Sequence, residues 1–171
     1  QRIPEDVRAV LQSLQAADHE AWCVGGCVRD LLLGGAPEDW DITTSALPEE
    51  TMALFGDRAV PTGLRHGTVT VRTEQRPVEI TTYRCDGAYA DHRHPEQVTF
   101  TYSLEEDLRR RDFTVNAMAL SETGKVRDPF GGQEDLKRKL LRCVGDPDRR
   151  FDEDALRMLR ALRFAAVLDF A

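Results

Sequence analysis

The sequence has no long apolar run and few cysteines. Among its 171 residues, no stretch approaches the roughly 18 consecutive apolar residues of a membrane-spanning helix, and the polar start shows no secretory signal. The cysteines at positions 23, 27, 85 and 143 are too few for a disulfide framework and show no Cys-x-x-Cys metal spacing. This cysteine usage fits a reducing compartment, so we expect a cytoplasmic protein.

Basic charge is also scarce. Lysine and arginine total 23 against 30 aspartates and glutamates, which gives a net charge of −7. Because proteins that bind nucleic acid over their whole surface are usually basic, any nucleic-acid contact is expected to be local or to lie outside this chain. The absence of an initiator methionine and the apolar end at 167–171 are typical of a fragment.

The remaining composition indicates a folded mixture of helices and strands. Hydrophobic residues make up 41% and charged residues 31% of the chain, which excludes a disordered protein. Apolar spacing predicts helices over 4–17, 27–33, 48–55, 104–109 and 151–170, with Ser45 or Thr51 as a possible cap of the third. Strands are expected over 21–24, 39–43, 68–72, 78–83, 114–120 and 126–128, and a mobile polar loop over 84–97. This mixture places the chain in the α+β class, or in a mixed α/β class.

Two aspartates flank a tryptophan in Asp39-Trp40-Asp41. On a strand both carboxylates would point the same way, while Trp40 and Ile42 would point into the core. Carboxylates this close repel each other unless a cation lies between them, and Mg²⁺ is the usual cation where phosphates are handled. Such pairs also cap turns or face solvent, so the pair alone does not decide between these roles.

Glu79 lies within a β-branched strand pattern. Val78 and Ile80 would share one face of the strand, which leaves Glu79 on the other. Taken alone, Glu79 is best interpreted as a solvent-facing residue. As a third carboxylate beside Asp39 and Asp41, it would complete a metal site.

Two adjacent glycines, Gly25 and Gly26, stand between an apolar strand and a helix, and Arg29 follows them. Glycines let backbone N–H groups approach a phosphate, and an arginine adds a charged fork. A Gly-Gly pair is usually just a turn, but here it lies thirteen residues before Asp39. A phosphate cradle and a metal pair are what nucleotidyl transfer needs together, whereas the lack of a Walker motif disfavours a P-loop ATPase.

Two further segments mix arginines with acids. The run at 109–116 offers phosphate donors and, through Asp112 and Asn116, acceptors for ribose hydroxyls, although a solvated helix end is the default interpretation. In the expected last helix, Asp154, Arg157 and Arg160 line one stripe with Glu153. That stripe fits either an ordinary amphipathic helix with internal ion pairs or a rigid pair that reads a base edge.

Together these segments resemble the class II nucleotidyltransferase family, which holds bacterial-type CCA-adding tRNA nucleotidyltransferases and bacterial poly(A) polymerases. The segments that carry the resemblance follow one another at 25–30 with 39–41, 78–84, 110–117, 128–136 and 150–157. The resemblance implies a head domain at 1–138, with a five-stranded mixed sheet flanked by helices. It also implies the truncated start of a helical neck at 139–171, with the family's body and tail absent.

The same resemblance implies template-independent addition of C, C and then A to the 3′ end of tRNA by two-metal catalysis. ATP and CTP would be the substrates, and the tRNA end would be weakly held without body and tail. Asp39 and Asp41 would hold Mg²⁺, and Glu79 would assist deprotonation of the primer hydroxyl. The nucleotide contacts implied are those of Gly25, Gly26, Arg29, Arg111, Asp112, Asn116, Asp154, Arg157 and Arg160. Within this set, Asp112 would favour a 2′-hydroxyl, and Asp154 and Arg157 would pair with the base.

Several alternatives stay open. The segment 62–69 resembles the CCA-type version more than the poly(A) version, and a full-length loop at 84–97 disfavours enzymes that add only CC. The sequence does not separate CCA addition from addition of A alone, because both keep the loop and the template residues. A poly(A) polymerase of the same fold is the other enzyme alternative. From a different class, the chain could be a catalytically inactive fragment that binds NTP or RNA, or a nucleotide sensor. The oligomeric state is not fixed by the sequence.

Overall fold

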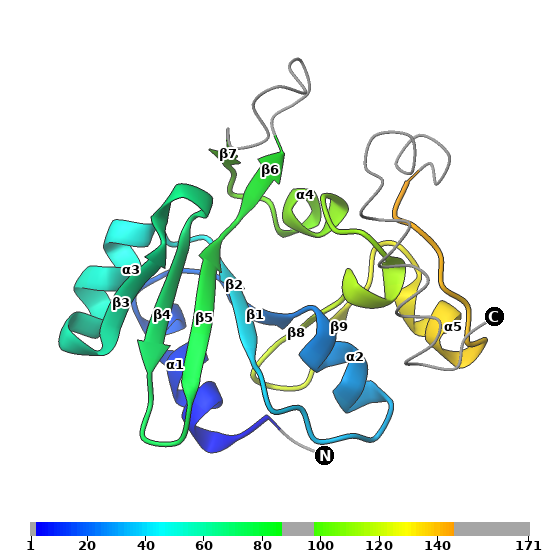
Figure 1. Ribbon diagram of the computed structural model, residues 1–171, viewed down its shortest axis with the longest axis horizontal. Helices are drawn as coiled ribbons and strands as arrows, with labels where there is room; N and C mark the ends of the chain where they lie inside the picture. The colour runs from blue at the N-terminus through cyan, green and yellow to red at the C-terminus, as the bar shows by residue number, and fades with distance from the viewer. Residues whose placement is uncertain (1–2, 87–97, 146–171) are drawn as a thin grey trace.

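One mixed sheet organises the computed structural model, which describes residues 3–86 and 98–145 (Figure 1). The strands of this sheet run in the order β3-β4-β5-β2-β1-β8-β9. Their bounds are β1 Ala21–Val24, β2 Asp41–Thr44, β3 Ala59–Gly63, β4 Thr68–Arg72, β5 Pro77–Thr82, β8 Ala119–Leu120 and β9 Val126–Arg127. A separate two-stranded sheet pairs β6 Arg84–Asp86 with β7 Val98–Phe100. The mixed sheet is confirmed, but the expected count of five strands is wrong, because the sheet has seven.

Five α-helices and three short 3₁₀ turns accompany the sheets in the described ranges. They are α1 Glu5–Ala16, α2 Gly26–Leu32, α3 Pro48–Phe55, α4 Leu104–Arg109 and α5 Gly132–Lys137, with η1 Gly56–Arg58, η2 Leu64–His66 and η3 Thr114–Asn116. The first four helices confirm the predicted ones to within one residue at each end. The helix predicted over 151–170 lies outside the described residues. No helix among the residues described is long and apolar enough to cross a membrane.

Three local features differ from the expectation. Strand β3 has no counterpart among the predicted strands, and its Pro61 is tolerated because β3 lies at an edge of the sheet. The helix α3 is capped by neither Ser45 nor Thr51; instead the Glu50 side chain accepts a hydrogen bond from the backbone N–H of Leu47 at 3.0 Å. The predicted loop at 84–97 begins as strand β6.

The predicted strand over 114–120 is mostly absent, since only Ala119–Leu120 pair in the sheet. Thr114–Asn116 instead form the turn η3, which packs against α5. The Thr114 hydroxyl donates to the carboxylate of Asp135, and a Cβ on Gly132 would overlap the Thr114 carbonyl oxygen. Tertiary contact with α5 therefore overrides the β-propensity of this segment.

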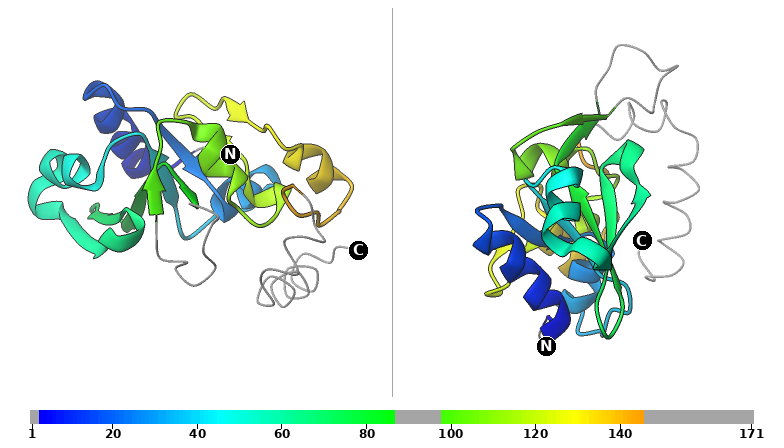
Figure 2. Two further views of the ribbon diagram at one scale, coloured as in Figure 1. Left: turned by 90° about the horizontal axis from the view of Figure 1, so that it is seen from above. Right: turned by 90° about the vertical axis from the view of Figure 1, so that its left-hand side faces the viewer.

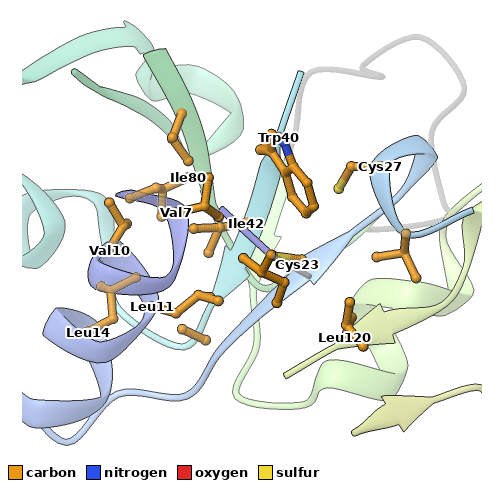
Figure 3. Close-up of a cluster of buried hydrophobic side chains, with 14 of the residues drawn as sticks. Val7, Val10, Leu11, Leu14, Cys23, Cys27, Trp40, Ile42, Ile80 and Leu120 are labelled. Atoms are coloured by element: carbon orange, nitrogen blue, oxygen red, sulfur yellow. The ribbon is translucent and has the colours of Figure 1, made fainter. Parts of the chain in front are cut away.

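The main core lies between the sheet and the helices α1 and α3, which contact each other on one side of it (Figures 1 and 2). Helix α1 buries Val7, Val10, Leu11 and Leu14. The same cluster contains the alternate apolar residues of the central strands, including Ile42 and Ile80, together with Trp40 (Figure 3). Because strand residues alternate between faces, the intervening side chains lie on the opposite face.

That opposite face of β4, β5 and β2 carries hydroxyls and carboxylates. The Thr68 and Thr81 hydroxyls are hydrogen-bonded at 2.9 Å, and Thr70 pairs with Glu79 across the β4–β5 ladder. In the parallel β2–β5 ladder, Asp41 pairs with Glu79. The apolar face thus fixes which residues form the polar one.

Truncation of a core leucine should test this arrangement. We expect Leu14→Ala, at a fully buried position on α1, to lower the free energy of unfolding by about 2–5 kcal/mol, because it removes apolar contacts and leaves a cavity. The matched control is Leu54→Ala on α3, where the side chain is 39% exposed and the expected loss is at most about 1 kcal/mol. Urea unfolding of both variants measures the difference, and equal losses would contradict the assigned core face.

Candidate active site

Three carboxylates gather where β2 begins. Asp41 is the first residue of β2 and lies opposite Glu79 of β5 in the parallel ladder. Asp39 precedes the strand, so the expectation that it lies within the strand is wrong. Trp40 and Ile42 are nevertheless buried, at 2% and 0% exposure, as predicted. The aspartates therefore alternate with core residues although only one of them is in the ladder.

Negative charge is crowded at Asp41. Burial and the neighbouring Glu79 carboxylate raise the pKa of Asp41 from 3.8 to about 6, Asp39 adds to the rise, and Arg111 opposes it. Within residues 3–86 and 98–145, no group of three or more acidic, histidine or cysteine side chains is already arranged around a metal position. The donor set still fits a hard cation, because carboxylate oxygens this close are stabilised by one.

Two arginines meet at the glycines between β1 and α2. Gly25 has a backbone φ of +83°, a conformation that residues other than glycine rarely adopt. A Cβ at Gly25 would lie 3.9 Å from a guanidinium nitrogen of Arg111, and one at Gly26 would lie 3.2 Å from a guanidinium nitrogen of Arg29. The expected glycine cradle is therefore flanked by two guanidinium groups of the kind that bind phosphate.

Arg29 connects this cradle to the segment 112–116. One guanidinium nitrogen donates to Oδ1 of Asn116 at 2.9 Å, and Nε donates to Asp30 at 2.9 Å. Asn116 in turn donates to Asp112 at 3.4 Å, and Asp112 also accepts from the backbone N–H of Phe113 at 2.8 Å. The structure thus brings together residues that are 87 positions apart in the sequence.

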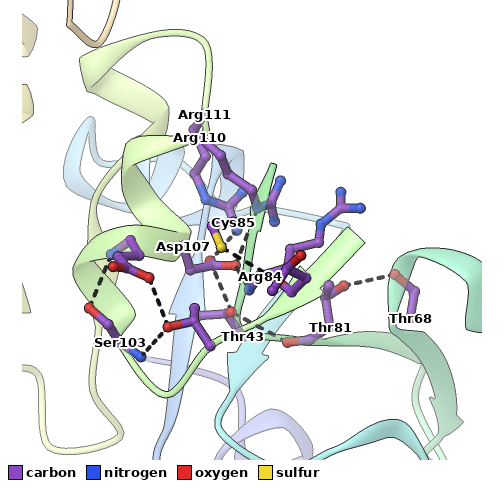
Figure 4. A network of polar contacts seen from close by, with 12 residues as sticks. Thr43, Thr68, Thr81, Arg84, Cys85, Ser103, Asp107, Arg110 and Arg111 are labelled. Carbon is purple, nitrogen blue, oxygen red and sulfur yellow. Dashed lines mark hydrogen bonds and ion pairs between the residues drawn. The ribbon is translucent and has the colours of Figure 1, made fainter. Parts of the chain in front are cut away.

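Sequence reasoning missed Asp107 on α4. This carboxylate is fully buried and accepts a hydrogen bond from Arg111 at 3.0 Å (Figure 4). A signal was present, because an acid four residues before an arginine on a helix faces it. The same spacing usually marks a weak surface pair, so the pattern did not single out Asp107. The predicted base-reading residues Asp154, Arg157 and Arg160 lie outside the described part of the chain.

Removal of one crowded carboxylate should stabilise the metal-free protein. Because its pKa is raised to about 6, ionised Asp41 opposes folding above that pH. In EDTA at pH 8, Asp41→Asn should therefore raise the melting temperature by about 2 °C or more, and the gain should shrink as the pH falls below 6 and wild-type Asp41 is protonated. Asp57→Asn, at an exposed position, is the control and should not show this pH dependence. An unchanged or lower melting temperature of Asp41→Asn at pH 8 would contradict the crowding of negative charge at Asp41.

Comparison with known proteins gives consistent results. Residues 21–142 match the family model of the poly(A) polymerase head domain. The chain is 55% identical over 167 residues to the CCA-adding enzyme of Geobacillus kaustophilus (strain HTA426), covering 98% of this chain and 41% of that protein.

Solved structures agree with the sequence matches. The crystal structure of the Bacillus stearothermophilus CCA-adding enzyme in complex with CTP matches with a TM-score of 0.88 and 48% identity, over 98% of this chain and 40% of that one. The Thermotoga maritima CCA-adding enzyme in complex with tRNA matches with a TM-score of 0.75 and 27% identity, over 100% of this chain and 40% of that one.

The chain therefore spans about two fifths of the length of these relatives. The resemblance inferred from the motifs is confirmed, since the match includes the glycines, all three carboxylates and the segment 110–117. This chain belongs to the poly(A) polymerase head-domain family of nucleotidyltransferases, which includes the CCA-adding enzymes.

Proposed function

We propose that this chain is the catalytic head of a CCA-adding tRNA nucleotidyltransferase, which adds C, C and then A to the 3′ end of tRNA from CTP and ATP. The observation that carries the proposal is the pairing of Asp41 with Glu79 on a polar sheet face, beside Asp39. Arg29 and Arg111 flank the glycines next to them. A carboxylate group beside a cationic cradle is what transfer from a nucleoside triphosphate requires.

CCA-adding nucleotidyltransferases are generally metal-dependent, and we propose Mg²⁺ as the ion, with Asp39 and Asp41 as its protein ligands. When bound, it would make the primer hydroxyl more acidic and neutralise charge on the leaving pyrophosphate.

Glu79 is exposed and adjacent to Asp41, so its carboxylate can help to orient the primer hydroxyl. Arg29 and Arg111 would bind the triphosphate, and Gly25 and Gly26 leave room for its approach.

The segment 112–116 would hold the ribose. Asp112 and Asn116 are each 8% exposed, and the Asp112 carboxylate is held by Asn116 and by the backbone of Phe113. Its acceptor oxygens would favour a sugar with a 2′-hydroxyl. Asp154 and Arg157 are proposed to read the base, on the resemblance of the segment 150–157. Arg160 is proposed to support this segment or to contact a phosphate.

Head and neck domains at 1–138 and 139–171 are part of the same proposal. The described residues after 138 remain in contact with the head through two backbone hydrogen bonds. The N–H of Thr114 donates to the carbonyl of Arg142 at 2.9 Å, and the N–H of Val144 donates to the backbone carbonyl of Asp112 at 3.0 Å. A cytoplasmic location is also proposed, from the low cysteine content. No disulfide joins the four cysteines, all of which lie in the described ranges.

Primer extension tests the reaction. The chain, and any longer protein of which it is part, is incubated with Mg²⁺ and a tRNA that lacks its last three nucleotides, with CTP and ATP separately and together. We expect two C additions followed by one A, and termination after that. A alone on a primer ending in CC would indicate an A-adding enzyme, and a long A ladder a poly(A) polymerase. Saturable NTP binding without any incorporation would indicate a binding fragment or a sensor and would contradict the proposal.

Removal of either metal ligand tests the mechanism. Asp39→Ala and Asp41→Ala should each reduce transfer by at least about 10³-fold, the scale on which electrostatic stabilisation of a reacting group acts. Circular dichroism should remain unchanged because both residues lie outside the apolar core. Asp57→Ala, which removes an exposed aspartate on η1, should retain wild-type turnover. Wild-type turnover in either ligand variant would refute the metal site.

A further inference from the structure

Asp107 is a buried carboxylate that four donors from three parts of the chain surround. It is fully buried on α4. Its Oδ2 accepts from the Thr43 hydroxyl at 3.0 Å and from a guanidinium nitrogen of Arg111 at 3.0 Å. Its Oδ1 accepts from the backbone N–H of Arg84 at 3.1 Å and from Nε of Arg110 at 3.3 Å. Figure 4 shows Asp107 among Thr43 of β2, Arg84 of β6 and the two arginines, Arg110 and Arg111, that directly follow α4.

The surroundings keep this carboxylate ionised. Burial alone would raise the pKa of Asp107, but Arg111, Arg110 and the N–H of Arg84 lower it below its ordinary value of 3.8. Both guanidinium groups are themselves shielded, with side-chain exposures of 13% for Arg110 and 18% for Arg111. An ion pair this well shielded from water holds its partners more firmly than a surface pair does.

Two contacts connect Asp107 to the proposed active site. Thr43 lies two residues after Asp41 on β2, so its hydroxyl shares a face with the Asp41 carboxylate. Arg111 extends from Asp107 toward the glycine cradle, where a guanidinium nitrogen lies 3.9 Å from the Cβ position of Gly25. The same Arg111 acts electrostatically on Asp41. Arg111 therefore spans the space between a fixed anchor and the carboxylates.

We propose that Asp107 is a positioning residue that fixes Arg111 beside Gly25 for contact with the triphosphate of the incoming nucleotide. This inference rests on the proposed function, since it takes a nucleoside triphosphate as the ligand. A long arginine side chain that must become ordered on binding reduces affinity, and an anchor formed before binding removes that cost. The contact of Asp107 with Thr43 also ties the position of Arg111 to the strand that carries Asp41.

The test is a double-mutant cycle read by ATP affinity in Mg²⁺, measured by calorimetry on the chain and on any longer protein that contains it. In Asp107→Asn one side of the amide donates instead of accepting, so it cannot accept from all four donors. We expect this variant to bind ATP about tenfold more weakly, a loss similar to that of Arg111→Met. The double variant should bind within about twofold of Arg111→Met, because residues that act as one unit are not additive.

The matched control is Glu105→Gln. This residue lies on the same helix and pairs with Arg109 at 3.2 Å, but its side chain is 50% exposed. The substitution makes the same change from carboxylate to amide and should leave ATP affinity unchanged. Melting temperatures of all variants are measured alongside, because a purely structural role of Asp107 would lower stability without coupling to Arg111.

Two results would overturn the inference: wild-type ATP affinity in Asp107→Asn, or a double variant that binds clearly more weakly than Arg111→Met. If Asp107→Asn does not fold, the double variant, which removes both partners of the pair, is compared with Arg111→Met alone. Equal affinity then supports the inference and a further loss refutes it. ATP binding without nucleotide transfer would refute the proposed function and leave this coupling measurable, whereas no ATP binding by the wild type would refute both.

Discussion

The parallel pairing of β2 with β5 is the contact on which the rest of the candidate site depends. It places Asp41 directly across from Glu79, although the two residues lie in different parts of the sequence. The pairing is held in register by the apolar face beneath it, where Ile42 and Ile80 are buried against α1. A slip of β5 by one residue against β2 would turn Glu79 toward the core and remove it from its place opposite Asp41. The hydrophobic packing of the helix layer thus determines the geometry of a charged site on the opposite face.

The site balances charge over a short distance. Asp41 is crowded by Glu79 and Asp39, which raises its pKa, whereas Asp107 is surrounded by arginines and its pKa is lowered. Arg111 interacts with both carboxylates. The protein therefore has one carboxylate, Asp107, whose charge is compensated by arginines, and another, Asp41, whose charge is opposed by neighbouring carboxylates. This contrast is the expected signature of a site in which some stability is given up for binding.

Helix α4 links strand β2, which carries Asp41, to the arginine beside the glycines. Its apolar residues Leu104 and Leu108 pack in a second buried cluster with Tyr83 and Val144, which fixes the helix over the end of β2. Asp107, between them on the helix, then reaches Thr43 and the backbone of Arg84. Arg111, which follows α4, is consequently held near Gly25, the residue before α2.

The sequence by itself determined most local features of this protein. Apolar periodicity located helices α1–α4 and strands β1, β2, β4 and β5, and the spacing of the glycines, the carboxylates and the segment 110–117 pointed to nucleotidyl transfer. Only the tertiary structure decided which residues meet. It placed Glu79 next to Asp41, joined Arg29 to Asn116, turned Thr114–Asn116 into a 3₁₀ turn against α5, and buried Asp107 beneath the arginines. The physical reason is that periodicity reports the face a residue occupies, whereas a contact between distant segments depends on strand order, register and burial, which arise only when the whole sheet and its helices pack together.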